Sequence, residues 1–244
     1  MTVAAAFDRA TDYDRHAIVQ ARVVARLADL LAAQPIGPGA QVLEIGCGTG
    51  LLGAALIDRL PGSTWLMTDI APVMVARTAR RFAGKPRVRT AVMDGEHPAG
   101  DARYDLICSS LAMQWFTDLP AAIGRLRALL APGGLLAFTT LAEGSFAEWR
   151  AALGDRPAGT PDYPSSSALE ALGLTVAIER HAIDHDDARH FLQTLKQIGA
   201  GTPRSGYAPL PPADLRRAMT RFEDMGATTT YVVATCTMRC AEAS

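Results

Sequence analysis

The chain has 244 residues, 49% of them hydrophobic, and 24 basic against 25 acidic residues leave a formal net charge of −1. That length suits one α/β domain with an added cap, and the apolar share is enough for a sizeable core. The near-neutral charge argues against a general nucleic-acid binder, and no apolar run is long enough to span a bilayer. The N-terminus lacks the basic region and apolar core of a signal peptide, so we expect a cytoplasmic protein with neither nucleic acid nor membrane as a partner.

The first predicted element is an amphipathic helix over residues 7–34. Val19, Val23 and Leu27 contribute to a broad apolar face, which is typical of a helix that packs on a domain. A second face carries polar residues at i, i+3 and i+7, namely Tyr13, His16 and Gln20. Two interpretations stay open: a helix that only packs on the domain edge, and a helical lid over residues 1–34 that closes on a ligand.

A strand, a glycine loop and a helix come next, in that order. The apolar run at 42–45 predicts a buried strand, and residues 51–60 carry leucines at helical spacing. Glycines stand at alternate positions between them, at Gly46, Gly48 and Gly50. Such glycines let backbone N–H groups and a helix N-terminus approach a ligand, so the pattern is typical of a nucleotide-type site. An ordinary glycine-rich turn is the alternative.

The spacing of the glycines in this loop restricts the class of ligand that it can bind. The dinucleotide fingerprint requires a glycine where Leu51 stands, and no lysine follows as a phosphate-binding loop would need. Glu44, two residues before the first glycine, is a poor neighbour for a pyrophosphate. It is a good neighbour for an ammonium group.

The next two strands are expected to lead into acidic residues. Residues 64–68 predict a strand that ends at Asp69 and is followed by a helix over 71–82, and residues 88–92 predict a strand shortly before Asp94. An aspartate at a strand tip can accept both hydroxyls of a ribose, although a helix N-cap is an alternative for Asp69. A turn aspartate is the alternative for Asp94.

The rest of the chain continues to alternate strands and helices. Further strands are expected at 104–108, 135–141, 174–183 and 228–238, and further helices at 119–130, 145–153, 188–198 and 213–225. Short connections between such elements imply parallel pairing. We therefore predict an α/β fold with a doubly wound, Rossmann-like sheet of seven mostly parallel strands and a helical cap.

The predicted domain is single, with a cofactor core over 41–141. Residues 142–227 are expected to supply cap and substrate elements with the sixth strand, and 228–238 the last strand. A sharp turn at 132–134 is expected before the fifth strand, and the Gly-, Pro- and Ser-rich residues 154–167 are expected to form a surface loop.

A histidine cluster suggests a metal site that we do not favour. His181, His185 and His190 lie among aspartates, but the expected strand and helix boundaries prevent a simple i, i+4 pair on a helix. We therefore expect no metal. No G-x-S-x-G elbow surrounds a serine, which argues against a hydrolase triad, and the arginines between 77 and 89 are typical of a solvated helix face.

The pattern E-x-G-x-G-x-G that begins at Glu44 resembles the first motif of class I S-adenosylmethionine-dependent methyltransferases. The resemblance implies S-adenosylmethionine as the cofactor and S-adenosylhomocysteine as the product. It also implies that Asp94 reaches the adenine amino group, that Met93 covers the ring, and that the acceptor lies beside residues 109–115. The cofactor-binding residues expected on this basis are Gln20, Glu44, Gly46, Cys47, Gly48, Gly50, Asp69, Ile70, Met74, Met93, Asp94, Gly95, Ser109 and Leu111.

Several longer segments are similar to a narrower family, the malonyl-[acyl-carrier protein] O-methyltransferases of biotin synthesis. These segments are Phe7–Ala10 with Tyr13–Ala17, Leu111–Trp115, Phe138–Leu141 with Gly144-Ser145, Thr194–Ala200 and Thr229–Tyr231. The resemblance implies an enzyme that esterifies the free carboxylate of a malonyl thioester, carried by acyl carrier protein or by CoA, early in biotin synthesis. One departure bears on the acceptor: residues 158–163 replace an Asn-Arg-Phe-Leu-like stretch of the family. If that arginine holds the malonyl carboxylate, this chain has lost or replaced it.

Methylating a carboxylate asks little of a general base, because an acid with a pKa of about 4 is already ionised at neutral pH. We expect alignment and desolvation to dominate, with no single essential acid–base residue. The residues expected to position the acceptor at the catalytic centre are Tyr13, His16, Gln114, Trp115 and Lys196, with Gln20 beside them.

Lys196 has two further interpretations, as a contact to the acidic surface of a carrier protein and as a solvated lysine on a cap helix. The whole protein also has alternatives. One is a methyltransferase for a small free carboxylic acid or another small metabolite, and another is a non-catalytic module that binds the cofactor. A nicotinamide-dependent oxidoreductase is disfavoured because Leu51 breaks its fingerprint.

Overall fold

The computed structural model describes residues 18–197 and 207–242 of the chain. Tyr13 and His16 of the predicted lid lie outside the described residues, as does the side chain of Lys196. Among the residues that are described, no helix combines the length and the apolar character needed to cross a membrane.

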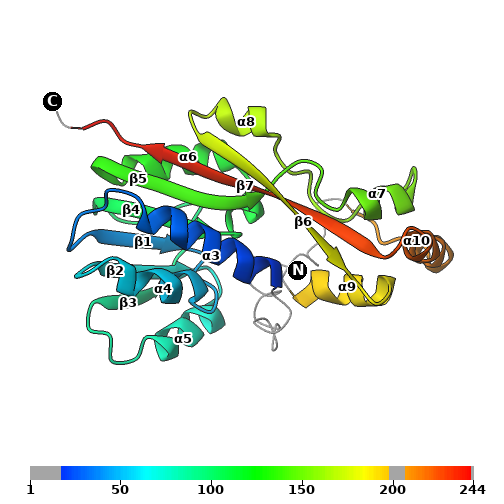
Figure 1. Ribbon diagram of the computed structural model, residues 1–244, viewed down its shortest axis with the longest axis horizontal. Helices are drawn as coiled ribbons and strands as arrows, with labels where there is room; N and C mark the ends of the chain where they lie inside the picture. The colour runs from blue at the N-terminus through cyan, green and yellow to red at the C-terminus, as the bar shows by residue number, and fades with distance from the viewer. Residues whose placement is uncertain (1–17, 198–206, 243–244) are drawn as a thin grey trace.

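A seven-stranded sheet forms the centre of the molecule (Figure 1). Its strands are β1 (Gln41–Ile45), β2 (Thr64–Asp69), β3 (Val88–Val92), β4 (Tyr104–Ser110), β5 (Leu130–Leu141), β6 (Thr175–Asp184) and β7 (Thr228–Arg239). They lie in the order β3-β2-β1-β4-β5-β7-β6, with β1 to β5 parallel and β7 antiparallel to both of its neighbours. The prediction of a doubly wound, mostly parallel sheet is confirmed. The strand order reverses between β1 and β4, and ligands of open α/β sheets bind at the carboxyl ends of the strands beside such a point.

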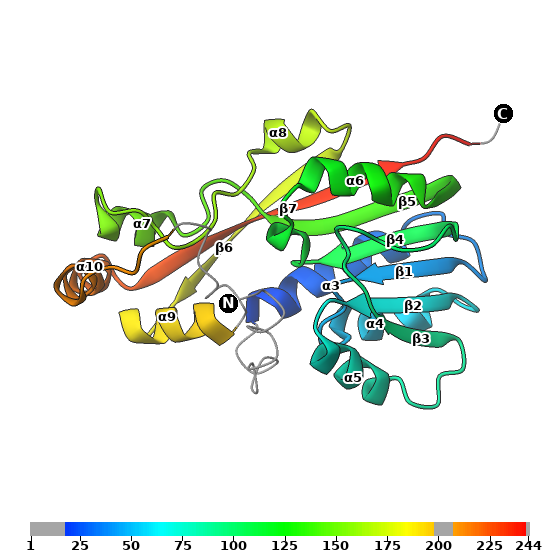
Figure 2. The ribbon, with the colours of Figure 1, turned by 180° about the vertical axis from the view of Figure 1, so that it is seen from behind.

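Helices cover both faces of this sheet. On one face, α3 (Ile18–Ala32) and α4 (Leu51–Leu56) bury leucines against β1, β2 and β4, while α5 (Pro72–Arg81) lies beside β2 and β3. On the other face, seen in Figure 2, α6 (Leu119–Ala128) and α8 (Ser166–Glu170) contribute to an apolar cluster with β4, β5 and β7. Burial on both faces accounts for the apolar runs in the central strands β1, β4 and β5.

A cap extends from the sheet along the long strands β6 and β7 (Figure 1). It contains α7 (Ala147–Leu153), α9 (Ala188–Gln197) and α10 (Pro212–Asp224). Its core is aromatic; for example, the ring centroids of Trp149 and Phe222 lie 5.7 Å apart. The first turns of α3 pack on this cluster and its later turns pack on the sheet, so α3 ties the cap to the core.

The fifth strand begins earlier than predicted. β5 starts at Leu130, because the turn expected at 132–134 is an irregularity inside the strand where its register against β4 shifts. Gly134 permits the close approach, since a Cβ atom there would lie 2.8 Å from the backbone oxygen of Tyr104. The prediction of a turn that precedes the strand is therefore wrong.

Two other boundaries also differ from the prediction. The helix expected over 51–60 ends at Leu56 and tightens into a 3-10 turn over Ile57–Arg59. The surface loop expected over 154–167 already contains the start of α8, where the Ser165 hydroxyl accepts a hydrogen bond from the Ala168 N–H at 3.1 Å.

Candidate functional site

The glycine loop after β1 leaves an open side at the carboxyl edge of the sheet. Gly46 and Gly48 both have left-handed backbones, with φ of 65° and 54°. A Cβ atom at Gly46 would lie 2.3 Å from the Ala112 Cβ, so the segment after β4 requires a glycine there. A Cβ atom at Gly48 would meet no described atom within 4 Å. Gly46 therefore serves packing, and Gly48 leaves space for a ligand.

Glu44 is a buried carboxyl group beside this loop. Only 2% of the residue is exposed, and its Oε2 has no hydrogen-bond partner among the described residues. Burial raises the pKa of Glu44 to about 8; the hydrogen bond from the Gly53 backbone N–H lowers it, and the charge of Asp69 adds to the rise. Such a group gains from a positively charged partner, because the charge favours the ionised form and the free oxygen can accept its hydrogen bond.

A small cavity of about 40 Å³ lies next to Glu44. It is lined by Gln20, Val24, Glu44, Gly46, Cys47, Gly48, Thr49, Leu51, Leu52 and Ser110. Its size admits a small polar group and excludes a whole nucleoside. The predicted residues from α3 and the glycine loop thus meet around one recess, which Ser110 of β4 also lines although it was not among the predicted site residues.

Asp69 lies at the end of β2 and is directed at the same loop. Its Oδ2 accepts a hydrogen bond from the Gly48 N–H and its Oδ1 one from the Ala71 N–H, both at 2.9 Å. The residue that caps α5 is Ala71, so the alternative role of Asp69 as a helix N-cap is not observed. These bonds fix the orientation of the Asp69 carboxylate beside the glycine loop.

Apolar side chains lie exposed at the ends of β2 and β3. Ile70 is 43% exposed and Val92 57% exposed, which suits the face of an aromatic ring. Met93 is half-buried, whereas Met74 is only 1% exposed. Gly95 is fixed by packing, since a Cβ atom there would lie 2.3 Å from a methyl carbon of Ile45.

Asp94 lies beside this apolar edge with its carboxylate already oriented. Its Oδ1 accepts from the Glu96 N–H at 2.9 Å, and its Oδ2 lies 2.9 Å from the His97 Nδ1. Partial burial raises the pKa of Asp94, but the hydrogen bonds from His97 and Glu96 outweigh it and the net shift is downward. Asp94 is therefore ionised at neutral pH and able to accept a hydrogen bond from an amino group.

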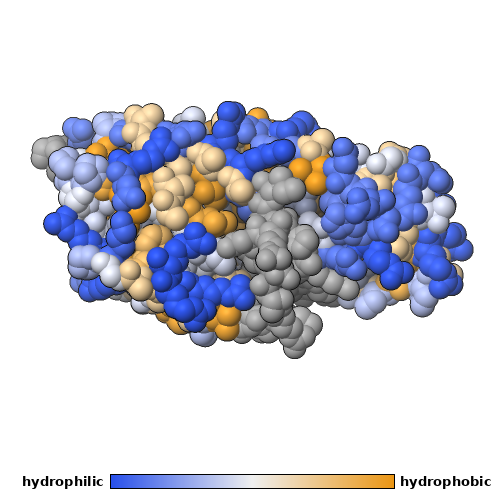
Figure 3. All heavy atoms as spheres, turned by 60° about the horizontal axis from the view of Figure 1, so that its bottom comes forward, coloured by the Kyte–Doolittle hydropathy of each residue, from blue (hydrophilic) through white to orange (hydrophobic). Residues whose placement is uncertain are grey.

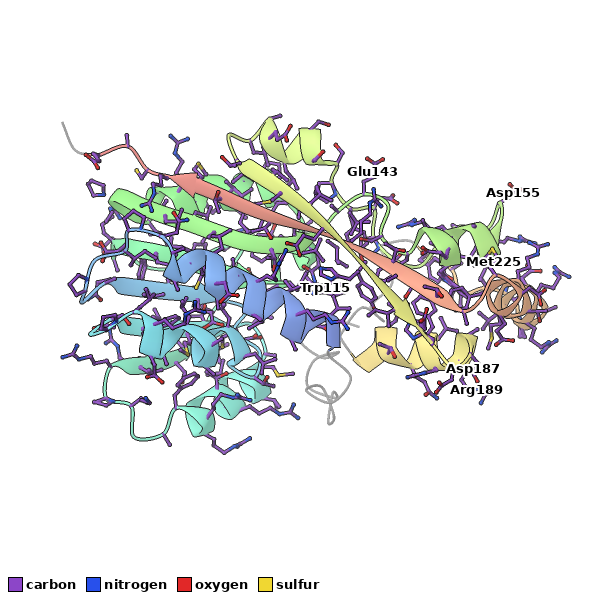
Figure 4. The ribbon with its side chains drawn as sticks, viewed as in Figure 1. Trp115, Glu143, Asp155, Asp187, Arg189 and Met225 are labelled. Carbon is purple, nitrogen blue, oxygen red and sulfur yellow. The ribbon has the colours of Figure 1, made fainter. Side chains whose placement is uncertain are left out.

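The segment after β4 is strained and leads to the cap. Leu111 has a left-handed backbone (φ 49°), held by hydrogen bonds from its N–H to the backbone and side-chain oxygens of Thr139. The Gln114 Nε2 donates to the Leu111 oxygen at 2.7 Å, while its Oε1 is buried without a partner among the described residues. Trp115 packs against the cap cluster, at the junction between core and cap (Figure 4). The Ser109 Oγ, just before this segment, is also buried without a described partner.

The sequence did not single out two buried hydroxyl groups of the cap. Thr160 and Tyr163 are 5% and 9% exposed, and neither hydroxyl has a partner among the described residues. The Tyr163 ring packs edge-on against Phe146 at 6.3 Å between centroids, so this part of the predicted surface loop is in fact buried. The only signal was the stretch 158–163 itself, where a tyrosine and a threonine stand in place of the family's usual residues.

Two of the three histidines near β6 have structural contacts, whereas the buried Nε2 of His181 has no hydrogen-bond partner among the described residues. The His185 Nε2 lies 2.9 Å from the Thr229 Oγ1, and the His190 Nδ1 lies 3.3 Å from a carboxylate oxygen of Asp186. Burial lowers the pKa of His185, with a smaller contribution from His190. Across 18–197 and 207–242, no group of three or more His, Cys, Asp or Glu side chains is arranged to hold a metal ion.

The chain shares sequence over most of its length with proteins of one enzyme family. Residues 43–136 match the model of a family described as a methyltransferase domain. Over 237 residues the chain is 40% identical to the malonyl-[acyl-carrier protein] O-methyltransferase of Magnetococcus marinus, covering 93% of this chain and 88% of that protein. The chain belongs to the malonyl-[acyl-carrier protein] O-methyltransferase family. It is a methyltransferase, as the glycine motif and the longer segments predicted.

A second relative is a longer protein. The chain is 47% identical over 240 residues to the biotin biosynthesis bifunctional protein BioCD of Bordetella avium, a match that covers 96% of this chain and 51% of that protein. The chain thus spans about half the length of that relative. A third relative, the malonyl-[acyl-carrier protein] O-methyltransferase of Geobacter sulfurreducens, is 39% identical over 214 residues, which are 80% of this chain and 79% of that protein.

Solved structures share the fold at low sequence identity. YcgJ from Bacillus subtilis has a TM-score of 0.63 at 17% identity, covering 89% of this chain and 99% of that chain. The N-methyltransferase NodS of Bradyrhizobium japonicum, solved with S-adenosyl-L-homocysteine, has a TM-score of 0.54 at 17% identity, covering 89% and 86%. The fold is that of a class I methyltransferase, which implies the use of S-adenosylmethionine.

Proposed function

We propose that this methyltransferase esterifies the free carboxylate of a malonyl thioester, carried by acyl carrier protein or by CoA, as an early step of biotin synthesis. The names of the relatives support the acceptor. The observation that carries the cofactor end is Glu44, a buried carboxyl group with an unpartnered oxygen beside the open side of Gly48. This arrangement fits the ammonium group of S-adenosylmethionine better than any phosphate.

The proposed roles at the cofactor end follow from position. Glu44 and the cavity beside it would hold the amino-acid head group, Asp69 the ribose hydroxyls, and Asp94 the adenine amino group. Ile70 and Met93 would cover the ring. When bound, S-adenosylmethionine supplies an electrophilic methyl carbon.

At the acceptor end the protein would position and desolvate a carboxylate. Gln114 and Trp115 lie where the core meets the cap. Thr160 and Tyr163 supply hydroxyl donors from the cap, and both belong to the stretch 158–163 that differs from the family. Burial raises the pKa of Tyr163, so its hydroxyl stays protonated and can donate to an anion. Neutral donors orient a carboxylate without quenching its nucleophilicity as a close cation would.

Three of the predicted acceptor residues remain candidates on sequence grounds alone. Tyr13 and His16 lie outside the described residues, and so does the side chain of Lys196. Replacing Lys196 by alanine is expected to leave cofactor binding intact and to weaken the acceptor step. Isothermal titration with S-adenosylmethionine and acceptor kinetics measure the two effects separately, and a loss of cofactor affinity would contradict the assignment.

The deciding experiment measures methyl transfer from S-adenosylmethionine by intact mass spectrometry. Malonyl-acyl carrier protein, malonyl-CoA and free malonate are offered in parallel. A methyl ester on a carrier-bound or CoA-bound malonyl group is the expected result. Transfer to free malonate alone would favour a methyltransferase for small acids, and no transfer with the cofactor bound would reject the acceptor.

A further inference from the structure

The outer end of the cap carries a shallow groove along α10. Two adjoining cavities of about 450 and 170 Å³ share Arg217 and Arg221 in their linings, and together we call them the α10 groove. Its polar lining is Asp155, Arg156, Asp214, Arg216, Arg217, Thr220 and Arg221. Figure 3 shows hydrophilic residues over most of the cap end, and Figure 4 places Asp155 and Met225 beside α10.

The groove has an excess of positive charge. Asp214 pairs with Arg156 at 2.8 Å and with Arg217, so one carboxylate serves two guanidinium groups. Arg216 and Arg221 are exposed and form no ion pair with any residue that the structure describes. Of the two acidic residues in the lining, only Asp155 remains to offset them, so the groove attracts anionic groups.

The helix presents these arginines on a fixed scaffold. The buried residues Ala218 and Phe222 anchor α10 in the aromatic core of the cap, and Ala218 also borders the groove. Asp214, itself 9% exposed, holds two of the four arginines in place. Arg216 and Arg221 form no such pair with a described residue, so their guanidinium groups can pair with carboxylate side chains of a partner.

The groove fits a protein surface better than a small anion. It is open and shallow, and its arginines are spread along more than one turn of α10. A free phosphate would contact only one or two of them and would remain in water, where such contacts are weak. An acidic helix or loop would meet all of them at once.

The groove also lies at a distance from the predicted methyl-transfer site. Leu141, at the carboxyl end of β5, pairs with Val233 of β7. From Val233 to Thr228, at the cap end of β7, the strand is about 17 Å long at 3.3 Å per residue, and α10 lies beyond that end (Figure 1). A substrate that is tethered to a protein by a long arm needs such an offset, because the protein docks on the surface while the arm reaches inward.

We propose that the α10 groove docks the acidic surface of the acyl carrier protein that delivers the malonyl group. This inference rests on the proposed function. Malonyl-CoA offers the same thioester arm without the protein. Comparing the kinetics of the two acceptors therefore distinguishes an effect on carrier docking from an effect on methyl transfer.

The test reverses the two unpaired arginines in the variant R216E/R221E. The matched control, R80E/R127E, reverses two exposed arginines on α5 and α6 of the core. The expected result for R216E/R221E is a rise of about tenfold in KM for malonyl-acyl carrier protein with kcat unchanged, and kinetics with malonyl-CoA within about twofold of the native protein. Added salt should raise the KM of the native protein for the carrier and have little effect on the variant.

A second readout measures binding of the carrier protein without turnover, by fluorescence anisotropy of labelled holo-acyl carrier protein. R216E/R221E should bind about tenfold more weakly than the native protein and the control. Equal binding by all three proteins would overturn the proposal, as would equal losses with carrier and CoA substrates. If the native protein methylates neither substrate, the proposed function fails, and the binding titration still decides the role of the groove.

Discussion

At the scale of single residues, the site is built around polar groups that are buried before any ligand arrives. Glu44, Gln114, Thr160 and Tyr163 each carry a buried oxygen without a described partner. Such groups cost stability, commonly about 1–3 kcal/mol each. Their concentration at the edge of the core and in the cap agrees with the proposed positions of the cofactor and the acceptor.

The raised pKa of Glu44 predicts an unusual pH dependence of the protein's stability. Because its folded-state pKa of about 8 lies above the value of 4.5 for an exposed glutamate, the folded protein holds a proton that the unfolded chain has lost between these values. Stability of the cofactor-free protein should therefore fall as pH rises from about 4.5 to about 8, with a slope of up to about 1.4 kcal/mol per pH unit from this group. Urea unfolding across that range measures it.

The variant E44Q carries the control for this prediction. Glutamine cannot ionise, so the part of the slope that belongs to Glu44 should disappear. The same variant should bind S-adenosylmethionine at least tenfold more weakly, because it offers the ammonium group no charge. An unchanged slope in E44Q would show that other groups cause the pH dependence.

Removing the Tyr163 hydroxyl should affect activity and stability differently. The variant Y163F should lower kcat/KM for the malonyl acceptor by about tenfold or more, as expected for a lost hydrogen bond to a charged group. Its stability should stay the same or rise, because the hydroxyl has no described partner to lose. Y104F, at the distant start of β4, is the control. Loss of stability without a change in kinetics would assign Tyr163 to packing alone.

At the scale of elements, the glycine loop between β1 and α4 combines two different requirements. Gly46 is enclosed by the segment after β4, whereas Gly48 faces open space. The two positions look equivalent in the sequence. Only their surroundings distinguish a packing role from a ligand role.

Alanine substitutions separate these two roles. G46A should destabilise the protein by more than about 2 kcal/mol, because the strain of a left-handed backbone adds to the 2.3 Å approach to Ala112. G48A should cost only about 1–2 kcal/mol of backbone strain while weakening cofactor binding strongly. Denaturant unfolding measures the free energy of unfolding, and calorimetric titration measures cofactor affinity. An equal loss of unfolding free energy in both variants would contradict the distinction.

At the scale of the whole molecule, the cap is a separate apolar unit joined to the core by β6, β7 and α3. Its aromatic cluster shares few residues with the cofactor end. A mutation that destabilises the packing of the cap should therefore leave the cofactor site intact.

The variant F222A tests this separation. Phe222 is fully buried between Trp149 and Phe191, so its truncation should cost about 3–5 kcal/mol in the cap. Hydrogen exchange should accelerate in α7, α9 and α10 while β1 to β4 stay protected. Affinity for S-adenosylmethionine should change by less than about threefold, and a collapse of cofactor binding would show that cap and core form one cooperative unit.

The sequence by itself predicted the seven strands, apart from where some of them begin and end, and the glycine loop, because these depend on local patterns. Apolar runs, turn glycines and the E-x-G-x-G-x-G spacing act within about ten residues of one another. They placed Glu44, Asp69 and Asp94 correctly at the carboxyl edge of the sheet. The chemical roles of these residues remain predictions.

The tertiary structure alone decided which residues are buried and which segments meet. It showed the shift of register inside β5, the burial of Thr160 and Tyr163 in a stretch that resembled a surface loop, and the absence of a helix-capping role for Asp69. It also joined Arg156 to α10, some sixty residues further along the chain. Burial and long-range pairing depend on the packing of distant segments, so no local pattern in the sequence can specify them.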